Sequence, residues 1–171
     1  MTGIMRNPLT FLVFFVVIAL PFGEQALGAP PGESVTITEQ VQLDFAQLNT
    51  PASGSETIII NPTTGGFSGS GTVQIGTPAR GQYKIKLTGN GSTTSATIDV
   101  QNISSGSGAV TISNFTADYG GSAIGALPQS GLAKPAKGQG TVLYLGATAQ
   151  YTSAVPAGTL TPTFDIVVTL Q

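Results

Sequence analysis

The sequence predicts an all-β protein, a single immunoglobulin-like β-sandwich of about seven to eight strands. Two observations lead to this class. Short runs rich in β-branched and aromatic residues recur between glycines and prolines, and apolar and polar residues alternate within those runs. Beyond the first residues, no window carries an apolar stripe of helical period for more than about two turns. A closed barrel of the same strands is the alternative architecture.

Residues 1–28 are predicted to be a secretory signal peptide. One cation, Arg6, precedes a nearly unbroken apolar run at 8–22, and the small-x-small stretch "ALG" at 26–28 predicts cleavage before Ala29. The run is shorter than the about 20 apolar residues that a membrane-spanning helix needs, although an uncleaved anchor is the other interpretation. We therefore expect an exported domain at 29–171, located in the periplasm, at the cell surface or outside the cell, without a membrane span.

Eight runs have the strand pattern, and glycine-rich stretches separate them. The predicted strands lie at 35–48, 56–61, 71–76, 82–89, 96–103, 109–117, 140–151 and 162–170. Predicted loops lie at 62–71, 104–108 and 125–140, and the pair Asn90-Gly91 is typical of a tight hairpin turn. In the run at 109–117, Val110 and Ile112 alternate but Phe115 is out of phase, which predicts a slip in the strand.

The charged residues exclude several function classes. The chain has six Lys and Arg and eight Asp and Glu, a net charge of −2, so it lacks the basic footprint of a protein that binds nucleic acid. It contains no histidine and no cysteine, which removes the common catalytic triads and thiolate zinc sites. The carboxylates are isolated from one another in sequence. We expect no enzymatic activity, no cofactor and no metal site.

The run at 35–48 is long for one strand and suggests an arm followed by a body strand. Glu39 interrupts its apolar face, because an unpaired carboxylate does not belong in an apolar groove. Val35, Ile37 and Val41 are then candidates for a donated strand that completes the sheet of a neighbouring copy. An ordinary first strand, kept within its own sandwich, fits the pattern equally well.

The stretch "AGTLTPTFDIVVTLQ" resembles the end of chaperone–usher pilins. The shared features are Gly158, the fourteenth residue counted back from the end, and the alternating Phe164, Ile166, Val168 and Leu170. Leu170 stands where pilins usually carry tyrosine, and the disulfide of many pilins is absent. The resemblance implies a pilin-like sandwich whose last strand pairs with a periplasmic chaperone before an outer-membrane usher assembles filaments.

More of the chain resembles a family of secreted bacterial domains of unknown function (number forty-four-oh-two). The matching stretches are "LDFAQL" (43–48), "GTPARGQYKIKL" (76–87), "LYLGATAQ" (143–150) and "AGTLTPTFDIVVTL" (157–170). Ala46 replaces the family's usual glycine, and Leu160 and Pro162 replace its final tyrosine and glycine. The resemblance implies export and a pilin-like sandwich, and it implies no reaction.

These observations predict a secreted, non-enzymatic structural protein of the bacterial cell surface, a fimbrial subunit that self-associates by strand complementation. The competing prediction is a monomeric adhesin or binding module. It would recognise glycan or protein through loops 62–71 and 119–140, with Tyr119 as a surface on which a sugar could stack.

Overall fold

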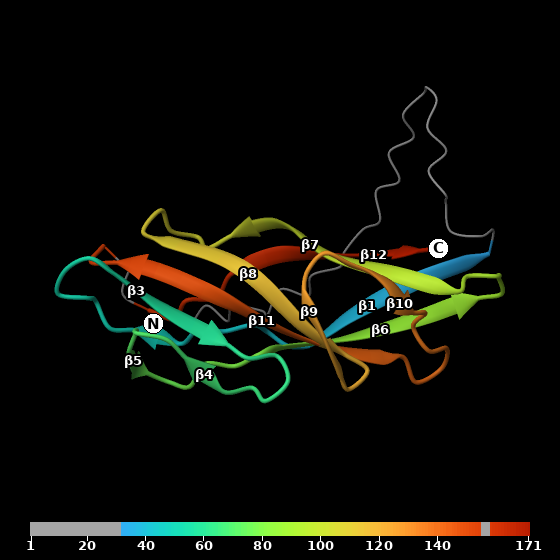
Figure 1. The fold of residues 1–171 in the computed structure, drawn as a ribbon, viewed down its shortest axis with the longest axis horizontal. Coiled ribbons are helices and arrows are strands. Elements are labelled where there is room, and N and C mark those ends of the chain that lie inside the picture. Colours follow the sequence, from blue (N-terminus) through green and yellow to red (C-terminus); the bar gives the residue numbers. More distant parts are fainter. Residues whose placement is uncertain (1–31, 155–157) are drawn as a thin grey trace, which may run out of the picture.

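The computed structural model describes residues 32–154 and 158–171, which form twelve β-strands and no helix (Figure 1). The strands are β1 (Glu33–Val41), β2 (Gln47–Leu48), β3 (Ser55–Ile60), β4 (Phe67–Ser68), β5 (Val73–Ile75), β6 (Gly81–Gly89), β7 (Ser95–Ser104), β8 (Val110–Tyr119), β9 (Ser122–Ala126), β10 (Gln129–Ala133), β11 (Thr141–Thr152) and β12 (Thr163–Leu170). The predicted all-β sandwich is confirmed. It has more strands than predicted, because three are only two or three residues long and because β4 and β10 lie within predicted loops.

The larger sheet has seven strands and is organised around β11. One edge of β11 pairs with β8, and its other edge pairs with β6 along residues 141–145 and with β3 along residues 148–152. β1, β4 and β9 extend this sheet beyond β6, β3 and β8. Gly146 lies where β11 passes from β6 to β3, and a Cβ there would collide with the backbone of Ile60. Only glycine allows that close approach.

A three-stranded sheet in the order β10-β7-β12 packs against part of the larger one, and β2 and β5 form a short separate ribbon. β6 belongs to the larger sheet and β7 to the smaller one. Residues 90–94 therefore cross between the two sheets. The tight hairpin turn predicted at Asn90-Gly91 is wrong, because the strands on either side of it pair with other partners.

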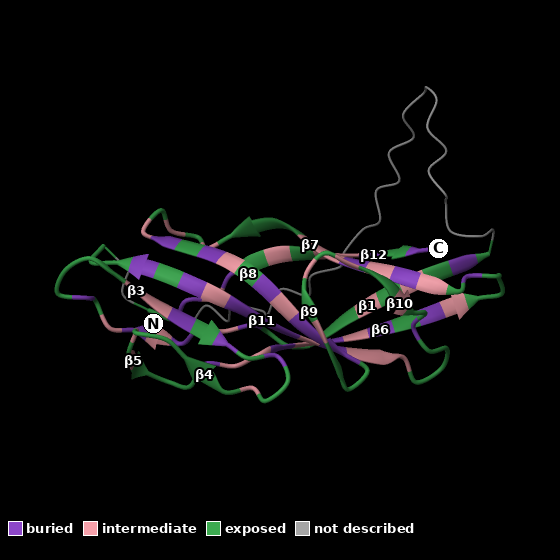
Figure 2. Ribbon diagram, viewed as in Figure 1, coloured by how far each residue is buried: buried purple, intermediate pink, exposed green. Residues whose placement is uncertain are grey.

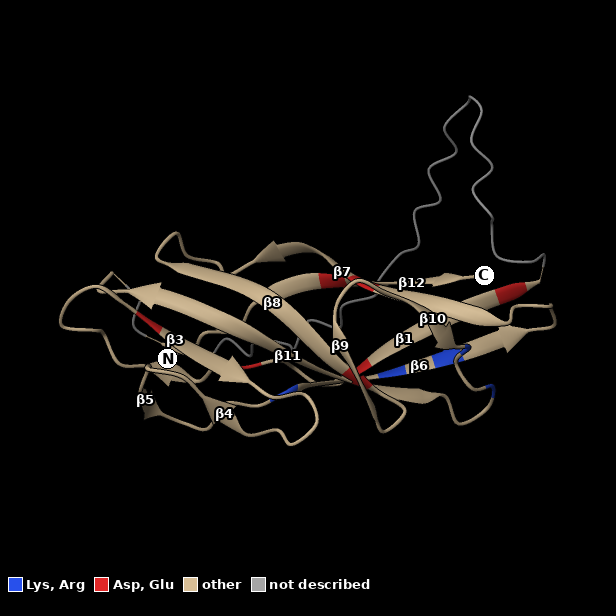
Figure 3. Cartoon of the chain, viewed as in Figure 1, with Lys and Arg blue, Asp and Glu red and all other residues tan. Residues whose placement is uncertain are grey.

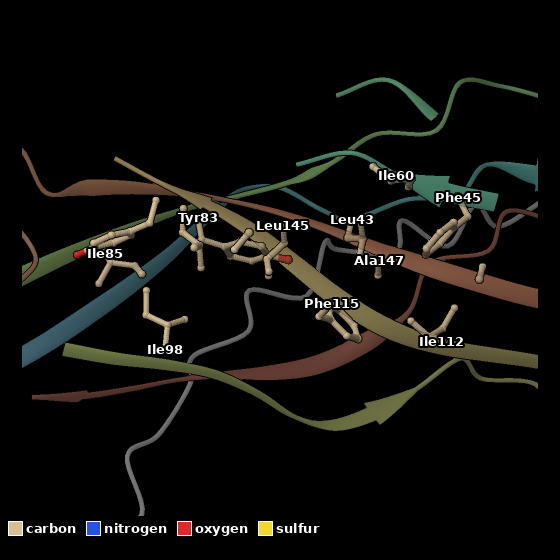
Figure 4. Close-up of a cluster of buried hydrophobic side chains, with 14 of the residues drawn as sticks. Leu43, Phe45, Ile60, Tyr83, Ile85, Ile98, Ile112, Phe115, Leu145 and Ala147 are labelled. Atoms are coloured by element: carbon tan, nitrogen blue, oxygen red, sulfur yellow. The ribbon is translucent and has the colours of Figure 1, made fainter. Parts of the chain in front are cut away.

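The hydrophobic core lies between the sheets, and buried positions alternate with exposed positions along most strands (Figure 2). Figure 4 shows side chains from both sheets meeting there, among them Ile85 of β6 and Ile98 of β7, neither of which is exposed to solvent. Tyr83, Ile85 and Leu87 are all buried, as their alternation predicts. The core therefore gathers apolar residues from strands far apart in the sequence.

The predicted slip in the run at 109–117 is confirmed as a β-bulge. Ser113 pairs with Thr148 and Thr116 pairs with Gly146, so two residues of β8 lie opposite one residue of β11. Within the bulge, Asn114 has a φ of 50°. The extra residue rotates Phe115 back towards the core, where it is buried.

The run at 35–48 is divided, as an arm followed by a body strand predicts, but the break falls after Val41 and not at Glu39. β1 ends at Val41, residues 42–46 carry only an isolated bridge between Asp44 and Ala79, and β2 begins at Gln47. Ala46 adopts a φ of 62°, which turns the chain before β2. Leu43 and Phe45 are nevertheless fully buried, so the alternating pattern correctly predicts the buried face of a segment that is not a regular strand.

Candidate functional site

Both strands predicted to take part in assembly are edge strands. Among the described residues, β1 pairs only with β6, and β12 pairs only with β7. Each therefore offers one line of backbone N–H and C=O groups outside the ladders of its own sheet. Such an edge is a template for pairing with another strand.

The two edges lie on the same side of the sandwich. On the edge of β6 opposite β1, Leu87 forms a bridge with Lys137, in the segment 134–140 that joins β10 to β11. β10 is thus tied to the β11 side of β6. Since β7 lies between β10 and β12, β12 lies on the β1 side. In the right half of Figure 1, β12 is drawn above β7 and β1 above β6. We call the outer edges of β1 and β12 the open edge.

The phase of the β12 ladder decides which residues face the open edge. Gln171 and Ser95 exchange hydrogen bonds in both directions, at 3.0 and 3.2 Å. Because such pairs recur at every second residue of an antiparallel ladder, Thr169 and Val167 also bond to β7. The backbone groups of the residues between them point away from β7, towards the open edge. These residues are Ile166, Val168 and Leu170.

The edge of β12 is not protected by the usual devices. The strand TFDIVVTL contains no proline and no lysine, and its one charge is Asp165, which accepts a hydrogen bond from Asn102 at 2.6 Å. The side chains of Val168 and Leu170 are buried, while Phe164 and Ile166 are half-buried. Within residues 32–154 and 158–171, β12 thus combines an apolar inner face with an unpaired backbone edge, as strand addition requires.

On β1, as on β12, alternate residues turn their backbone N–H and C=O groups towards the open edge. The N–H of Leu87 donates to the carbonyl of Ala136, away from β1, so the pair of Val35 and Leu87 is not hydrogen-bonded. The backbone groups of Val35 and Ile37 therefore face the open edge, while their half-buried side chains pack against the core. Val41, the third predicted donor residue, is 41% exposed and lies beyond a register shift that follows Glu39. The structure thus groups Val35 with Ile37 and leaves Val41 outside the packed face.

Glu33, the first residue of β1, lies in a niche beside Gly91 and Thr93 that the sequence pattern does not reveal. Its carboxylate is buried and accepts a 3.2 Å hydrogen bond from the N–H of Thr93. A Cβ at Gly91 would lie 2.6 Å from Cδ of Glu33, so glycine is needed to make room. Thr93 holds the pKa of the Glu33 carboxyl below its usual value, and the charges of Lys137 and Lys134 act in the same direction against the cost of burial.

β12 is anchored at its beginning by an aromatic cluster and by the segment before it. Phe164 contacts Tyr83 and Phe115, with ring centroids 6.1 and 5.2 Å away. Before the strand, Leu160 is buried and exchanges backbone hydrogen bonds with residues 45 and 46. Gly158 has a φ of 118° with open space where a Cβ would lie, so it serves the backbone conformation and contributes no packing.

Carboxylates elsewhere serve local structure. Asp44 accepts from the N–H of Ala46, and Asp118 accepts from the N–H of Gly121. In the part of the chain that the structure describes, no three of the potential ligand residues gather as a metal site, and no helix is long and apolar enough to cross a membrane. Tyr119 is buried, so the sugar-stacking surface predicted there is wrong.

The fold and the open edge define a β-sandwich domain with two edge strands on one side, β1 and β12. The chain matches, over residues 35–169, the family described as domain of unknown function DUF4402, and it belongs to that family. The comparisons with curated proteins and with solved structures find no match. The predicted signal peptide at 1–28 lies outside the described residues.

Proposed function

We propose that this protein is an exported, non-enzymatic structural subunit of the bacterial cell surface, pilin-like, that assembles into filaments by strand complementation. The observation that carries the proposal is the open edge. β1 and β12 present backbone edges on the same side of one sandwich that no other described strand covers. An incoming strand can pair with either edge and insert alternate side chains towards the core.

β1 is the strand best suited to exchange between copies. It pairs with the rest of the sandwich through one ladder, with β6, and most of its side chains are exposed. Without β1, the edge of β6 would be bare, and the buried Ile85 and Leu87 would lose the cover of Ile37 and Val35. If β1 of one copy covers β6 of the next, the contact is heterologous and repeats into an open filament. Before assembly, a periplasmic chaperone would cover the edge of β12, and an outer-membrane usher would exchange the partners.

The test compares the chain from Ala29 with a form that begins at Gln40, each measured by light scattering and thermal unfolding. We expect the longer form to build concentration-dependent oligomers, and the shorter form to be unstable alone. A peptide with the sequence of residues 33–41 should raise the unfolding temperature of the shorter form. The matched control peptide carries Val35→Asp and Ile37→Asp, and it should have no effect, because carboxylates cannot enter the apolar face. A shorter form that is stable and indifferent to the peptide would refute strand complementation.

One observation favours a second function, a monomeric binding module. β1 pairs with β6 of its own chain at eight positions, and Glu33 holds its beginning in the niche at Gly91, so the sandwich is complete without a neighbour. Such a module would bind through loops 62–71 and 119–140, where Phe67 is 48% exposed. A longer form that stays monomeric at high concentration, with a shorter form rescued by the peptide, would favour this module over the filament.

A further inference from the structure

We propose that Asn90 is a site of spontaneous intramolecular deamidation, and that its β-linked product loosens the niche at the beginning of β1. The dipeptide Asn90-Gly91 occurs once in the chain, in the segment 90–94 that crosses between the two sheets. Both residues are exposed and lie outside the strands. The inference does not depend on the proposed function, because it concerns the covalent chemistry of this segment.

The nucleophile of the reaction is the backbone nitrogen of Gly91. This nitrogen loses its proton to solvent hydroxide and bonds to the side-chain carbon Cγ of Asn90, which releases ammonia and closes a succinimide ring. Water then breaks one of the ring C–N bonds. Breaking the bond to Cγ gives an α-linked aspartate, and breaking the bond to the backbone carbonyl carbon gives a β-linked aspartate. Overall, one water is consumed and one ammonia is released.

Glycine at position 91 leaves the nitrogen open to this attack, and the fold requires that glycine. A glycine has no Cβ to shield its own N–H. A Cβ at Gly91 would lie 2.6 Å from both Cγ and Cδ of Glu33, so the packing of Glu33 requires the residue that makes Asn90 reactive. Among the described residues, the N–H of Gly91 has no hydrogen-bond acceptor.

The other described asparagines lack this combination. Asn61 precedes a proline, which has no N–H to deprotonate. Asn49, Asn102 and Asn114 precede threonine, isoleucine and phenylalanine, whose side chains crowd the attacking nitrogen. Asn102 is exposed, as Asn90 is, so exposure alone does not distinguish the two. The residue that follows the asparagine does.

Lys137 is placed to promote the reaction. Its Nζ donates to Oδ1 of Asn90 at 3.4 Å. A positive charge there draws electron density from Cγ and stabilises the negative charge that develops on Oδ1 as the nitrogen adds. Figure 3 draws basic residues between β10 and β11 at the same end of the molecule as the acidic beginning of β1.

The β-linked product adds a methylene to the backbone where the chain has no room. On one side, a Cβ at Gly89 would collide with the carbonyl of Gly32, and on the other side Gly91 packs against Glu33. We expect the longer backbone to break the hydrogen bond from the N–H of Thr93 to the Glu33 carboxylate. The α-linked product keeps the original backbone length and therefore keeps the niche.

The test incubates the folded chain from Ala29 in mildly alkaline buffer and follows Asn90 by peptide mass mapping. The reference is a synthetic peptide of residues 86–96, in which the fold gives no protection. We expect conversion within about tenfold of the peptide rate, because an exposed segment needs little opening. Both aspartate forms should appear, and conversion should slow in mildly acidic buffer. Asn102 in the same digest is the internal control and should stay unconverted.

Substitutions separate the parts of the proposal. Asn90→Gln, whose longer side chain closes a ring less readily, should slow conversion at least about tenfold. Lys137→Gln should slow it about two- to fivefold, and the matched control Lys86→Gln, also at an exposed lysine, should not. Freshly purified Asn90→Asp, which has the α-linked side chain, should unfold at the temperature of the original.

Ageing should weaken the hold on β1. The converted original should unfold about 2–6 °C below the equally aged Asn90→Gln variant, since one hydrogen bond to a charged group is lost. Amide hydrogen exchange should also become faster in β1. Three results would overturn the inference. They are conversion more than about tenfold slower than in the peptide, formation of the α-linked product alone, and a converted original as stable as the aged variant.

Discussion

The ring of Phe164 on β12 lies edge-on to the ring of Phe115 on β8, with centroids 5.2 Å apart and planes at 65°. Tyr83 of β6 meets Phe164 in a similar geometry, at 6.1 Å and 69°. β12 belongs to the smaller sheet, and β6 and β8 belong to the larger one. The aromatic cluster therefore joins the open-edge strand to the opposite sheet, and edge-to-face pairs of this kind add about 0.5–1.5 kcal/mol beyond their buried area.

Replacing Phe164 should loosen β12 and destabilise the whole sandwich. A Phe→Ala substitution in a protein core costs about 3–5 kcal/mol. Because Phe164 is only half-buried, we expect Phe164→Ala to lower the free energy of unfolding by about 2–3 kcal/mol. Denaturant titration measures the loss. Phe67→Ala is the matched control, because Phe67 is 48% exposed, and it should cost less than about 1 kcal/mol. Equal losses at the two positions would contradict the structural role of the cluster.

Ala46 is a site where a single substitution should stabilise the protein. Its φ of 62° is strained for a residue with a Cβ and unstrained for glycine, and its Cβ lies 3.3 Å from the position of a Cβ on Gly76. Left-handed backbone costs about 1–2 kcal/mol for an L-residue. Ala46→Gly should therefore raise the free energy of unfolding by about 1 kcal/mol after the greater entropy of unfolded glycine is subtracted. Ala52→Gly, at an exposed position, is the control and should not stabilise; a destabilised Ala46→Gly variant would show that the turn is unstrained.

The Glu33 niche should make stability depend on acid pH. The pKa of this carboxyl is lowered in the folded state from its ordinary value of 4.5, so the folded state favours the charged form. Its stabilising contribution is fully present above about pH 4.5 and is lost as the pH falls through the lower folded-state value. Glu33→Gln should be less stable than the original at neutral pH.

Thermal unfolding of both proteins between pH 7 and pH 3 checks this prediction. The difference between the two unfolding temperatures should narrow as the pH falls, because the original loses the contribution that the variant lacks. Asp165→Asn, which changes an exposed carboxylate on β12, controls for general effects of charge removal. A constant difference across the pH range would show that ionisation of Glu33 does not stabilise the niche.

Proline substitutions can report which backbone groups of β12 face the open edge. Ile166 and Val167 are both half-buried, but the ladder phase leaves the N–H of Ile166 free and bonds that of Val167 to β7. Val167→Pro should cost about 1–3 kcal/mol more than Ile166→Pro, since it also leaves the carbonyl of its half-buried partner, Asp99, without its ladder hydrogen bond. Under the proposed function, Ile166→Pro should in addition weaken assembly, because it removes an outward donor. Denaturant titration measures the loss of stability, and light scattering measures assembly. Equal destabilisation by both prolines would contradict the assigned hydrogen-bonding phase of β12.

Much of the architecture could be predicted from local pattern. Alternation in β6 and β7 correctly assigns their buried faces, and the interrupted phase before Phe115 predicts the bulge at Asn114. These predictions succeed because the period of side-chain direction along a strand is a property of the backbone itself. At residues 42–46 the alternation predicts the buried Leu43 and Phe45 correctly, but the predicted regular strand does not form because the segment has only an isolated bridge.

The sequence by itself determined the all-β class, the alternating inner faces and the two terminal segments with an apolar face. It could not determine that β1 and β12 lie on one side of the sandwich, or that Glu33 enters a niche beside Gly91. Each of these depends on which strands become neighbours. Pairing brings together residues more than fifty positions apart, and their proximity depends on the packing of the whole core, not on any local preference of the chain.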